Sequence, residues 1–222
     1  MGYAFDFTVV VEHWRELLQG CLLTLQLSLL AMPVTLAIAI VAVFMLQMHE
    51  RVSTWLIGTF VEIVRNTPFL VQIFFLFFGL PTIGVRLDPN VAAIVALSLN
   101  GAAYAIEILR AGVDAVSRGQ IEAGLALGLK PVQIFRYIVL KPALRTVYPA
   151  LTSQFIFLML TSSIASSITA RELTHVGAEL EAVTFRSFEV YFTIAGLYLV
   201  MSFGLSKLFA LIGRVSFAYP AR

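Results

Sequence analysis

The stretch Glu122-Ala123-Gly124-Leu125-Ala126-Leu127-Gly128, followed by Ile138, Leu140 and Pro142, decides how this chain folds. It lies in the most cationic loop of the sequence, with one long apolar segment before it and another after it. A polar loop between two such segments is a hydrophilic hairpin outside the bilayer, because charged side chains are costly inside hydrocarbon. The sequence on either side therefore has to supply membrane-spanning elements.

The composition indicates a membrane protein before any motif is considered. The 222 residues are 59% hydrophobic and 13% charged, whereas about a quarter of the residues of a soluble domain are charged. Mean hydropathy is +0.91, and the net charge of +2 is too small to indicate a nucleic-acid partner. The single Cys21 excludes an internal disulfide framework. The three histidines are scattered, so no metal site is expected.

The gaps between charged residues predict an all-α integral membrane protein with about five transmembrane helices. Continuous apolar runs favour helices over a β-barrel, and each run is close to or above the roughly 20 residues that a bilayer requires. The transmembrane domain is expected at 20–214, with spans at about 20–47, 54–80, 90–111, 146–170 and 190–213. Residues 1–19 are expected to form an amphipathic lead-in rather than a signal peptide, and residues 215–222 a cytoplasmic tail.

The distribution of Lys and Arg predicts the orientation. One side of the five expected spans carries ten cations, which are Arg51, Arg110, Arg118, Lys130, Arg136, Lys141, Arg145, Lys207, Arg214 and Arg222. The other side carries four, which are Arg15, Arg86, Arg171 and Arg186. Because cationic loops stay in the cytoplasm, the N-terminus is expected outside, and the C-terminus and the hairpin inside.

The hairpin is expected to contain two short helices, at 120–129 and 131–139. Pro131 interrupts the first and suits the first turn of the second. Gly124 and Gly128 are expected to form a small-residue face that allows another surface to approach closely, although an ordinary helix lying on the membrane is the alternative. The chain has no GxxxxGK[ST] sequence, so it is not expected to bind ATP.

The hairpin resembles the EAA loop of the permease subunits of ABC importers. The spacing from Glu122-Ala123 to Gly128 and Ile138 matches, whereas Gly124 replaces the usual second Ala and the Pro follows one residue late, at 142. Residues 61–72, which contain Arg65-Asn66-Thr67-Pro68, and residues 102–112, which contain Ala103-Tyr104 and Glu107, resemble the polar amino acid branch of these permeases. The resemblance covers nearly the whole chain.

The resemblance implies a function, a location and a set of partners. It implies a multi-pass permease of the bacterial inner membrane that moves a polar amino acid inward. The implied partners are two ATPase subunits, a second permease subunit that is identical or homologous, an extracytoplasmic amino-acid-binding protein, and membrane lipid. ATP and Mg²⁺ belong to the ATPase, so this chain is not expected to be an enzyme or to hold a cofactor. The implied coupling residues are Glu122, Ala123, Gly124, Gly128, Leu140 and Pro142.

Ionisable and hydroxyl side chains within the spans are candidates for the substrate path. They are Glu62, Arg65, Gln72, Tyr104, Glu107, Thr161, Ser162 and Ser163. Glu62 and Arg65 are three residues apart and so can form an ion pair, as can Glu107 and Arg110, with purely structural pairing as the alternative. The hydroxyls of the fourth span are expected either in a broken helix that receives the substrate or in a packed interface between subunits.

Thr161 stands where many members of this branch carry an acidic residue. A carboxylate there would suit a cationic amino acid, so the resemblance makes arginine, lysine or histidine a less suitable substrate. The alternative is that this chain is one half of a heterodimer whose other subunit binds the substrate.

Two other classes compete with the importer. A secondary transporter normally shows internal repeats and more spans, and a membrane-embedded enzyme needs a cluster of catalytic side chains at membrane depth. The sequence shows neither feature.

Overall fold

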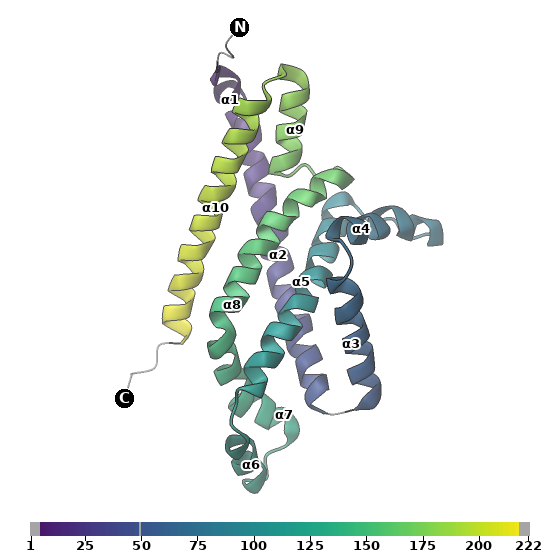
Figure 1. Ribbon diagram of the computed structural model, residues 1–222, viewed down its shortest axis with the longest axis vertical. Coiled ribbons are helices and arrows are strands. Elements are labelled where there is room, and N and C mark those ends of the chain that lie inside the picture. Colours follow the sequence, from purple (N-terminus) through teal and green to yellow (C-terminus); the bar gives the residue numbers. More distant parts are fainter. Residues whose placement is uncertain (1–4, 49, 218–222) are drawn as a thin grey trace.

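The computed structural model describes residues 5–48 and 50–217, and this part of the chain is entirely helical, without strands (Figure 1). Its α-helices are α1 (Thr8–Glu12), α2 (Trp14–Gln47), α3 (Arg51–Arg65), α4 (Phe69–Phe74), α5 (Pro89–Asp114), α6 (Arg118–Ala126), α7 (Pro131–Gln133), α8 (Leu140–Thr161), α9 (Leu173–Thr184) and α10 (Ser187–Ser216). Two π-helices, η1 (Phe75–Gly79) and η3 (Ile134–Val139), and two 3₁₀-helices, η2 (Leu80–Ile83) and η4 (Ser162–Ile168), complete the series.

Four helical runs are long and apolar enough to cross a membrane, which supports the expected class of fold. They are α2, α5, the continuous run Pro131–Ile168, and α10. A fifth candidate joins α3 to the helical segment Phe69–Ile83, but the two parts are bent by 108°. The all-α membrane fold is therefore confirmed, with four spans, or five if the bent pair is one span.

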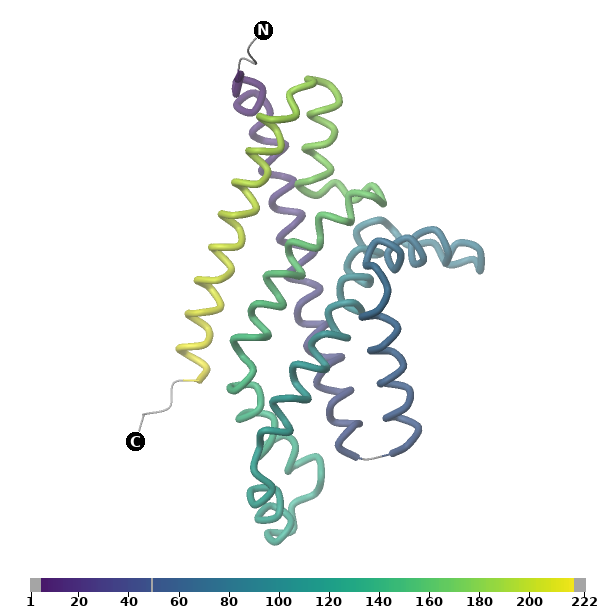
Figure 2. Tube along the Cα trace, viewed as in Figure 1, coloured from purple at the N-terminus to yellow at the C-terminus, as the bar shows by residue number. Residues whose placement is uncertain are grey.

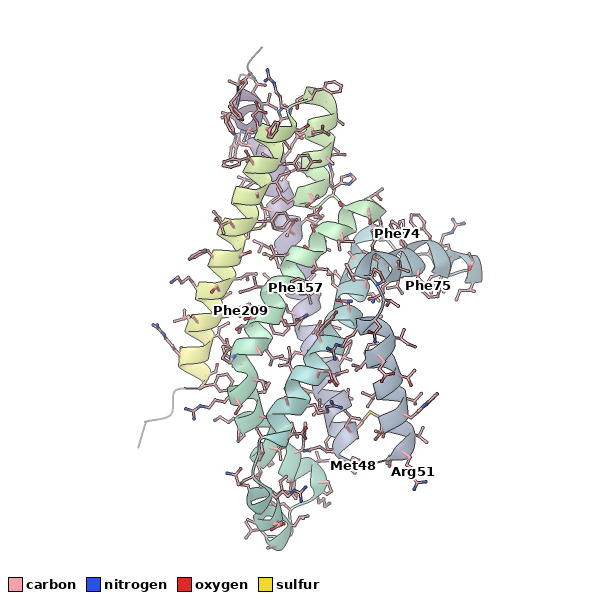
Figure 3. All side chains as sticks on the ribbon, viewed as in Figure 1. Met48, Arg51, Phe74, Phe75, Phe157 and Phe209 are labelled. Carbon is pink, nitrogen blue, oxygen red and sulfur yellow. The ribbon has the colours of Figure 1, made fainter. Side chains whose placement is uncertain are left out.

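The second span differs from the expected single helix at 54–80. Thr67 and Pro68 interrupt it, because proline has no N–H to donate and disfavours a helical residue before it. After the break, α4, η1 and η2 leave the bundle as an arm (Figure 2). Both Phe74 and Phe75 lie on this arm (Figure 3), where Phe75 is 70% exposed and Phe74 is partly buried against the core cluster that contains Ile73.

The ends of the first and last spans also differ from the expected boundaries. α2 begins at Trp14, within the expected lead-in 1–19, and Glu16 in its first turn suits the positive end of the helix dipole. It continues without a break through Pro33 to Gln47. α10 reaches Ser216, within the expected tail, and residues 218–222 lie outside the described part of the chain.

Small residues allow α2, α5 and α8 to pack closely at the centre of the bundle. α5 buries a run of alanines, which are Ala92, Ala93, Ala96, Ala102, Ala103 and Ala105. A Cβ at Gly101 would lie 2.9 Å from Oγ1 of Thr35, and one at Gly112 would lie 2.9 Å from the carbonyl oxygen of Ala143. Close approach of backbones replaces the hydrophobic driving force that is absent between helices in lipid.

The two ends of the bundle carry different elements (Figure 1). α6, α7, the turn between α2 and α3, and the last turns of α10 lie toward one end. The N-terminal helix and α9 lie at the other end, and the arm leaves the bundle from the same half. The described elements that carry most cations of the ten-cation side of the sequence thus lie toward one end of the bundle.

Candidate functional site

The helix α6 of the polar hairpin forms at 118–126, close to the first expected piece. Its C-terminus is closed by a Schellman arrangement, in which the N–H of Gly128 donates to the carbonyl of Leu125 and the N–H of Leu129 to that of Gly124. Gly128 has a φ of +72°, the left-handed conformation that favours glycine at this position. The spacing from Gly124 to Gly128 therefore encodes the end of the helix.

The two glycines of the hairpin, which are expected to form a small-residue face, have different surroundings. Gly128 has open space where a Cβ would stand. Gly124 is buried, and a Cβ there would lie 2.6 Å from Cδ1 of Ile138 and 3.2 Å from Cγ1 of Ile134. At Gly124 the surface that approaches closely belongs to this same chain, whereas the described residues leave the space beside Gly128 open.

The outward side of α6 carries the other expected coupling residues. Glu122 and Ala123 are exposed, and Leu125 and Leu127 are 57% and 79% exposed. A short helix of this kind, held on one side and open on the other, offers a mixed apolar and acidic surface to a partner.

The second half of the hairpin is not a separate helix at 131–139. Pro131 begins α7, where the N–H of Lys130 donates to Oε1 of Gln133, and the chain then passes through the π-helix η3 directly into α8. Leu140 and Pro142 consequently lie in the first turn of α8. These two expected coupling residues belong to the start of a span rather than to the exposed loop.

The charged residues of the second and third spans meet across two helices. Nη1 of Arg65 lies 3.7 Å from Oε2 of Glu107, and Nη2 of Arg110 lies 3.1 Å from the same oxygen. The guanidinium of Arg65 also lies 5.5 Å from the ring centre of Tyr104. Arg65 therefore pairs with Glu107 and not with Glu62 as the spacing suggested, because α3 and α5 pack side by side.

These charges are only partly covered by the rest of the chain. The side chains of Arg65, Glu107 and Arg110 are 43%, 30% and 54% exposed. An ionised group in a span that this chain does not bury has to face water or another protein surface. The arrangement therefore places a partly exposed cluster of charges on one face of α3 and α5.

Gln72 connects the broken second span to α5. Its Nε2 donates to the carbonyls of Val64 and Thr67, and its Oε1 accepts from Nδ2 of Asn100 at 3.0 Å. It also lines an open, mostly apolar hollow of about 370 Å³ inside the bend. The candidate thus has a clear structural role, since it satisfies the carbonyl of Val64, whose helical donor would be the N–H that Pro68 lacks.

The hydroxyls of the fourth span are satisfied by its own backbone. Thr161, Ser162 and Ser163 donate to the carbonyls of Phe157, Met159 and Leu160. The span tightens into the 3₁₀-helix η4 and ends at Thr169, whose φ is +64°. The expected break therefore takes the form of a tightened helix. Ser162 is fully buried, whereas the hydroxyls of Thr161 and Ser163 are exposed.

The structure contains a buried carboxylate that sequence reasoning did not single out. Glu172, fully buried, accepts from Oη of Tyr198 at 2.7 Å, from Oγ1 of Thr24 at 3.4 Å and from the N–H of His175 at 2.9 Å. Burial raises the pKa of the Glu172 carboxyl, although these hydrogen bonds act in the opposite direction. The sequence could not distinguish Glu172 from the other acidic residues of its loop, since two of its donors come from α2 and α10.

The described residues offer no cluster of three or more His, Cys, Asp or Glu that could hold a metal ion.

The structure has the features of a polytopic transport subunit. They are apolar spans, a bent second span, an exposed hairpin helix and half-exposed charges within the spans. Residues 35–214 match the family described as "Binding-protein-dependent transport system inner membrane component". The chain belongs to this family and is a permease component of the inner membrane. The match confirms the resemblance found in the sequence.

Individual relatives cover nearly the whole chain. The glutamine transport system permease protein GlnP of Escherichia coli (strain K12) is 35% identical over 204 residues, which span 91% of this chain and 93% of that protein. The L-cystine transport system permease protein TcyB of Bacillus subtilis (strain 168) is 32% identical, with 100% and 96% covered. The nopaline transport system permease protein NocM of Agrobacterium fabrum is 32% identical, with 91% and 88% covered.

Two solved structures share the fold. The chain of an amino acid ABC transporter crystallised with histidines superposes with a TM-score of 0.85 at 32% identity, covering 96% of this chain and 99% of that one. A chain of the MetNI methionine ABC transporter in an inward-facing conformation superposes with a TM-score of 0.76 at 20% identity, covering 92% and 98%. The second likeness concerns the fold alone.

Proposed function

We propose that this chain is the permease subunit of an ATP-driven importer for a polar amino acid, coupled to its ATPase through the hairpin 120–142. The observation that supports the coupling is the outward face of α6, where Glu122, Leu125 and Leu127 are exposed. The amino acid class is supported by the relatives, whose names specify glutamine and L-cystine transport.

The proposed orientation puts the N-terminus outside and α6 in the cytoplasm. The gathering of α6, α7 and the end of α10 at one end of the bundle supports it (Figure 1), together with the excess of Lys and Arg in these elements. An ATPase subunit then contacts α6 and supplies the ATP and Mg²⁺ chemistry. The permease itself carries out no hydrolysis.

A second permease subunit covers the face of α3 and α5 that carries Arg65, Tyr104 and Glu107. The partial exposure of the two charged groups supports this, because lipid would leave them poorly solvated. The substrate path then runs between the two subunits and includes Glu62, Gln72 and the hydroxyls of Thr161 and Ser163, whereas the fully buried Ser162 packs inside the subunit. α9, at the opposite end from α6, is the surface offered to the binding protein.

The neutral side chain at position 161 favours an uncharged polar side chain in the substrate. Its hydroxyl donates to Phe157 and is exposed, so it contributes no charge to the path. Thr161→Asp is expected to shift uptake toward cationic amino acids, because a carboxylate attracts a second ammonium group. Unchanged specificity would place this part of the span in a subunit interface instead of the path.

The test is to express the chain with the ATPase and binding-protein genes that neighbour it and to purify through a tag on the permease. The expected result is a complex that retains the ATPase, with a binding protein whose Tm rises with one polar amino acid among the twenty. Uptake into proteoliposomes should then require ATP. A permease that transports the same amino acid without any ATPase would contradict the proposal.

A further inference from the structure

The helix α6 rests on the remainder of the chain mainly through Gly124, with the partly buried Ile121 packed against the core cluster that contains Ile134. It packs chiefly against η3, and its buried residue at this contact is Gly124. Ile134 and Ile138 of η3 approach so closely that a Cβ at position 124 would stand 3.2 and 2.6 Å from their nearest atoms. The position of α6 is therefore set by side chains of η3 pressed against the α6 backbone.

The other side of η3 is anchored in the core. Phe135 and Val139 are 6% and 1% exposed, and the ring of Phe135 lies 5.1 Å from that of Phe44 in α2. η3 continues without a gap into α8 and from there into η4. A displacement received at Ile138 thus has a continuous helical connection to the hydroxyls of the fourth span.

The joint itself is a π-helix, and α6 has room to move beside it. π-helical turns are rare and frequently occur at functional sites, because their wider turn is easily rearranged. An open hollow of about 270 Å³ lies between the end of α2 and α6, lined among others by Met48, Ile121 and Leu125. α6 is thus supported along η3 and open on its α2 side.

We propose that Gly124, Ile134 and Ile138 form a pivot on which α6 rocks and through which its displacement reaches the fourth span. The glycine is needed because the isoleucine side chains occupy the space of a Cβ. This inference rests on the proposed docking of an ATPase on the outer face of α6 and adds the residues that pass the motion inward. They are positioning residues, which contact neither the ATPase nor the substrate.

The test measures substrate transported per ATP hydrolysed by the complete transporter in proteoliposomes, with a mixture of radiolabelled polar L-amino acids as the probe. Gly124→Leu is expected to lower this ratio about tenfold and Gly124→Ala about threefold, as for contacting residues that interact strongly. The ATPase should stay bound, because position 124 faces the permease body. The matched control is Gly119→Ala in the same helix, where a Cβ meets nothing within 4 Å.

A compensating change separates a pivot from simple damage. Ile138→Val removes the Cδ1 atom nearest to position 124. In the Gly124→Ala background it should therefore raise the substrate transported per ATP hydrolysed to at least half of the wild-type value. Wild-type coupling in both Gly124 variants, or a double variant as poor as Gly124→Ala, would overturn the pivot. Failure of the proposed function looks different, because wild type and Gly119→Ala would then show no ATP-dependent uptake at all.

Discussion

The two ends of this permease hold their peripheral helices, α9 and α6, in opposite ways. α9 is fixed by a buried carboxylate, with donors on α2 and α10 directed at Glu172. α6 rests on apolar side chains at Gly124 and is otherwise largely exposed. Buried hydrogen bonds fix a helix in register and direction, whereas an apolar contact is non-directional and tolerates sliding.

The difference indicates which end is built to move. Two glycines bring α9 tightly against its neighbours. A Cβ at Gly20 of α2 would lie 2.9 Å from Cα of Leu173, and a Cβ at Gly177 of α9 would overlap Ile194. α6 has one such contact and a hollow beside it. α9 and the residues that pack against it, here called the α9 cap, are therefore part of a rigid scaffold, and the hairpin is the lightly held element.

The largest expected effect on stability comes from removing the buried carboxylate. Glu172→Ala leaves the hydroxyls of Thr24 and Tyr198 and the amide of His175 without their acceptor. We expect a loss of about 3 kcal/mol or more, seen as a fall in Tm of roughly 6–12 °C in detergent. Glu179→Gln is the matched control, because that carboxylate is 46% exposed and its ion pair with Arg171 is worth little. Equal losses in the two variants would show that Glu172 does not anchor the α9 cap.

The next effect comes from the glycine between α2 and α9. Gly20→Ala places a methyl group against the backbone of Leu173, which cannot rotate away, and should cost about 1–3 kcal/mol. Gly58→Ala in α3 is the control, because nothing lies within 4 Å of its Cβ position and the helix gains up to about 1 kcal/mol. Thermal unfolding of the two variants should therefore move in opposite directions. A stabilised Gly20→Ala variant would show that the α9 cap is less closely packed than the structure indicates.

A smaller effect is expected at the end of α6. Gly128→Ala forces a Cβ into a left-handed conformation and should cost about 1 kcal/mol, with Asn tolerated better than Ala. Gly84, whose φ is +89° in the arm, supplies the control, because Gly84→Ala carries the same strain at the other end of the molecule. Both variants should lose a similar amount of stability, but only Gly128→Ala should weaken retention of the ATPase on a tagged permease. If both variants retained the ATPase equally well, the C-terminal end of α6 would have no part in coupling.

The sequence could foresee the hairpin better than the α9 cap. Gly128 and Pro131 punctuate α6 locally, so its position follows from residues within one turn of its end. The anchoring of Glu172 depends on Thr24, 148 residues away along the chain, and no local pattern encodes such a contact. The prediction that Arg65 pairs with Glu62 was wrong for the same reason. Spacing along one helix carries no information about Glu107, which lies on the neighbouring helix. Bilayer-length apolar runs located most spans, but the effect of Pro68 on direction could be seen only in three dimensions.

The smallest expected effect on stability accompanies a large effect on function, at Glu122. Its side chain is exposed on the outer face of α6, so Glu122→Lys should change the unfolding free energy by no more than about 0.5 kcal/mol. Charge reversal on a docking surface nevertheless places like charges together or breaks an ion pair in the complex, which is costly even where the isolated surface is indifferent. We expect the variant to insert normally, to keep its Tm, and to lose ATPase co-purification and ATP-dependent uptake. Glu50→Lys is the control, because it makes the same change in the exposed turn between α2 and α3 at the same end of the molecule. If both reversals released the ATPase equally, the contact would depend on the net charge at this end of the molecule, and α6 would not be the specific docking site.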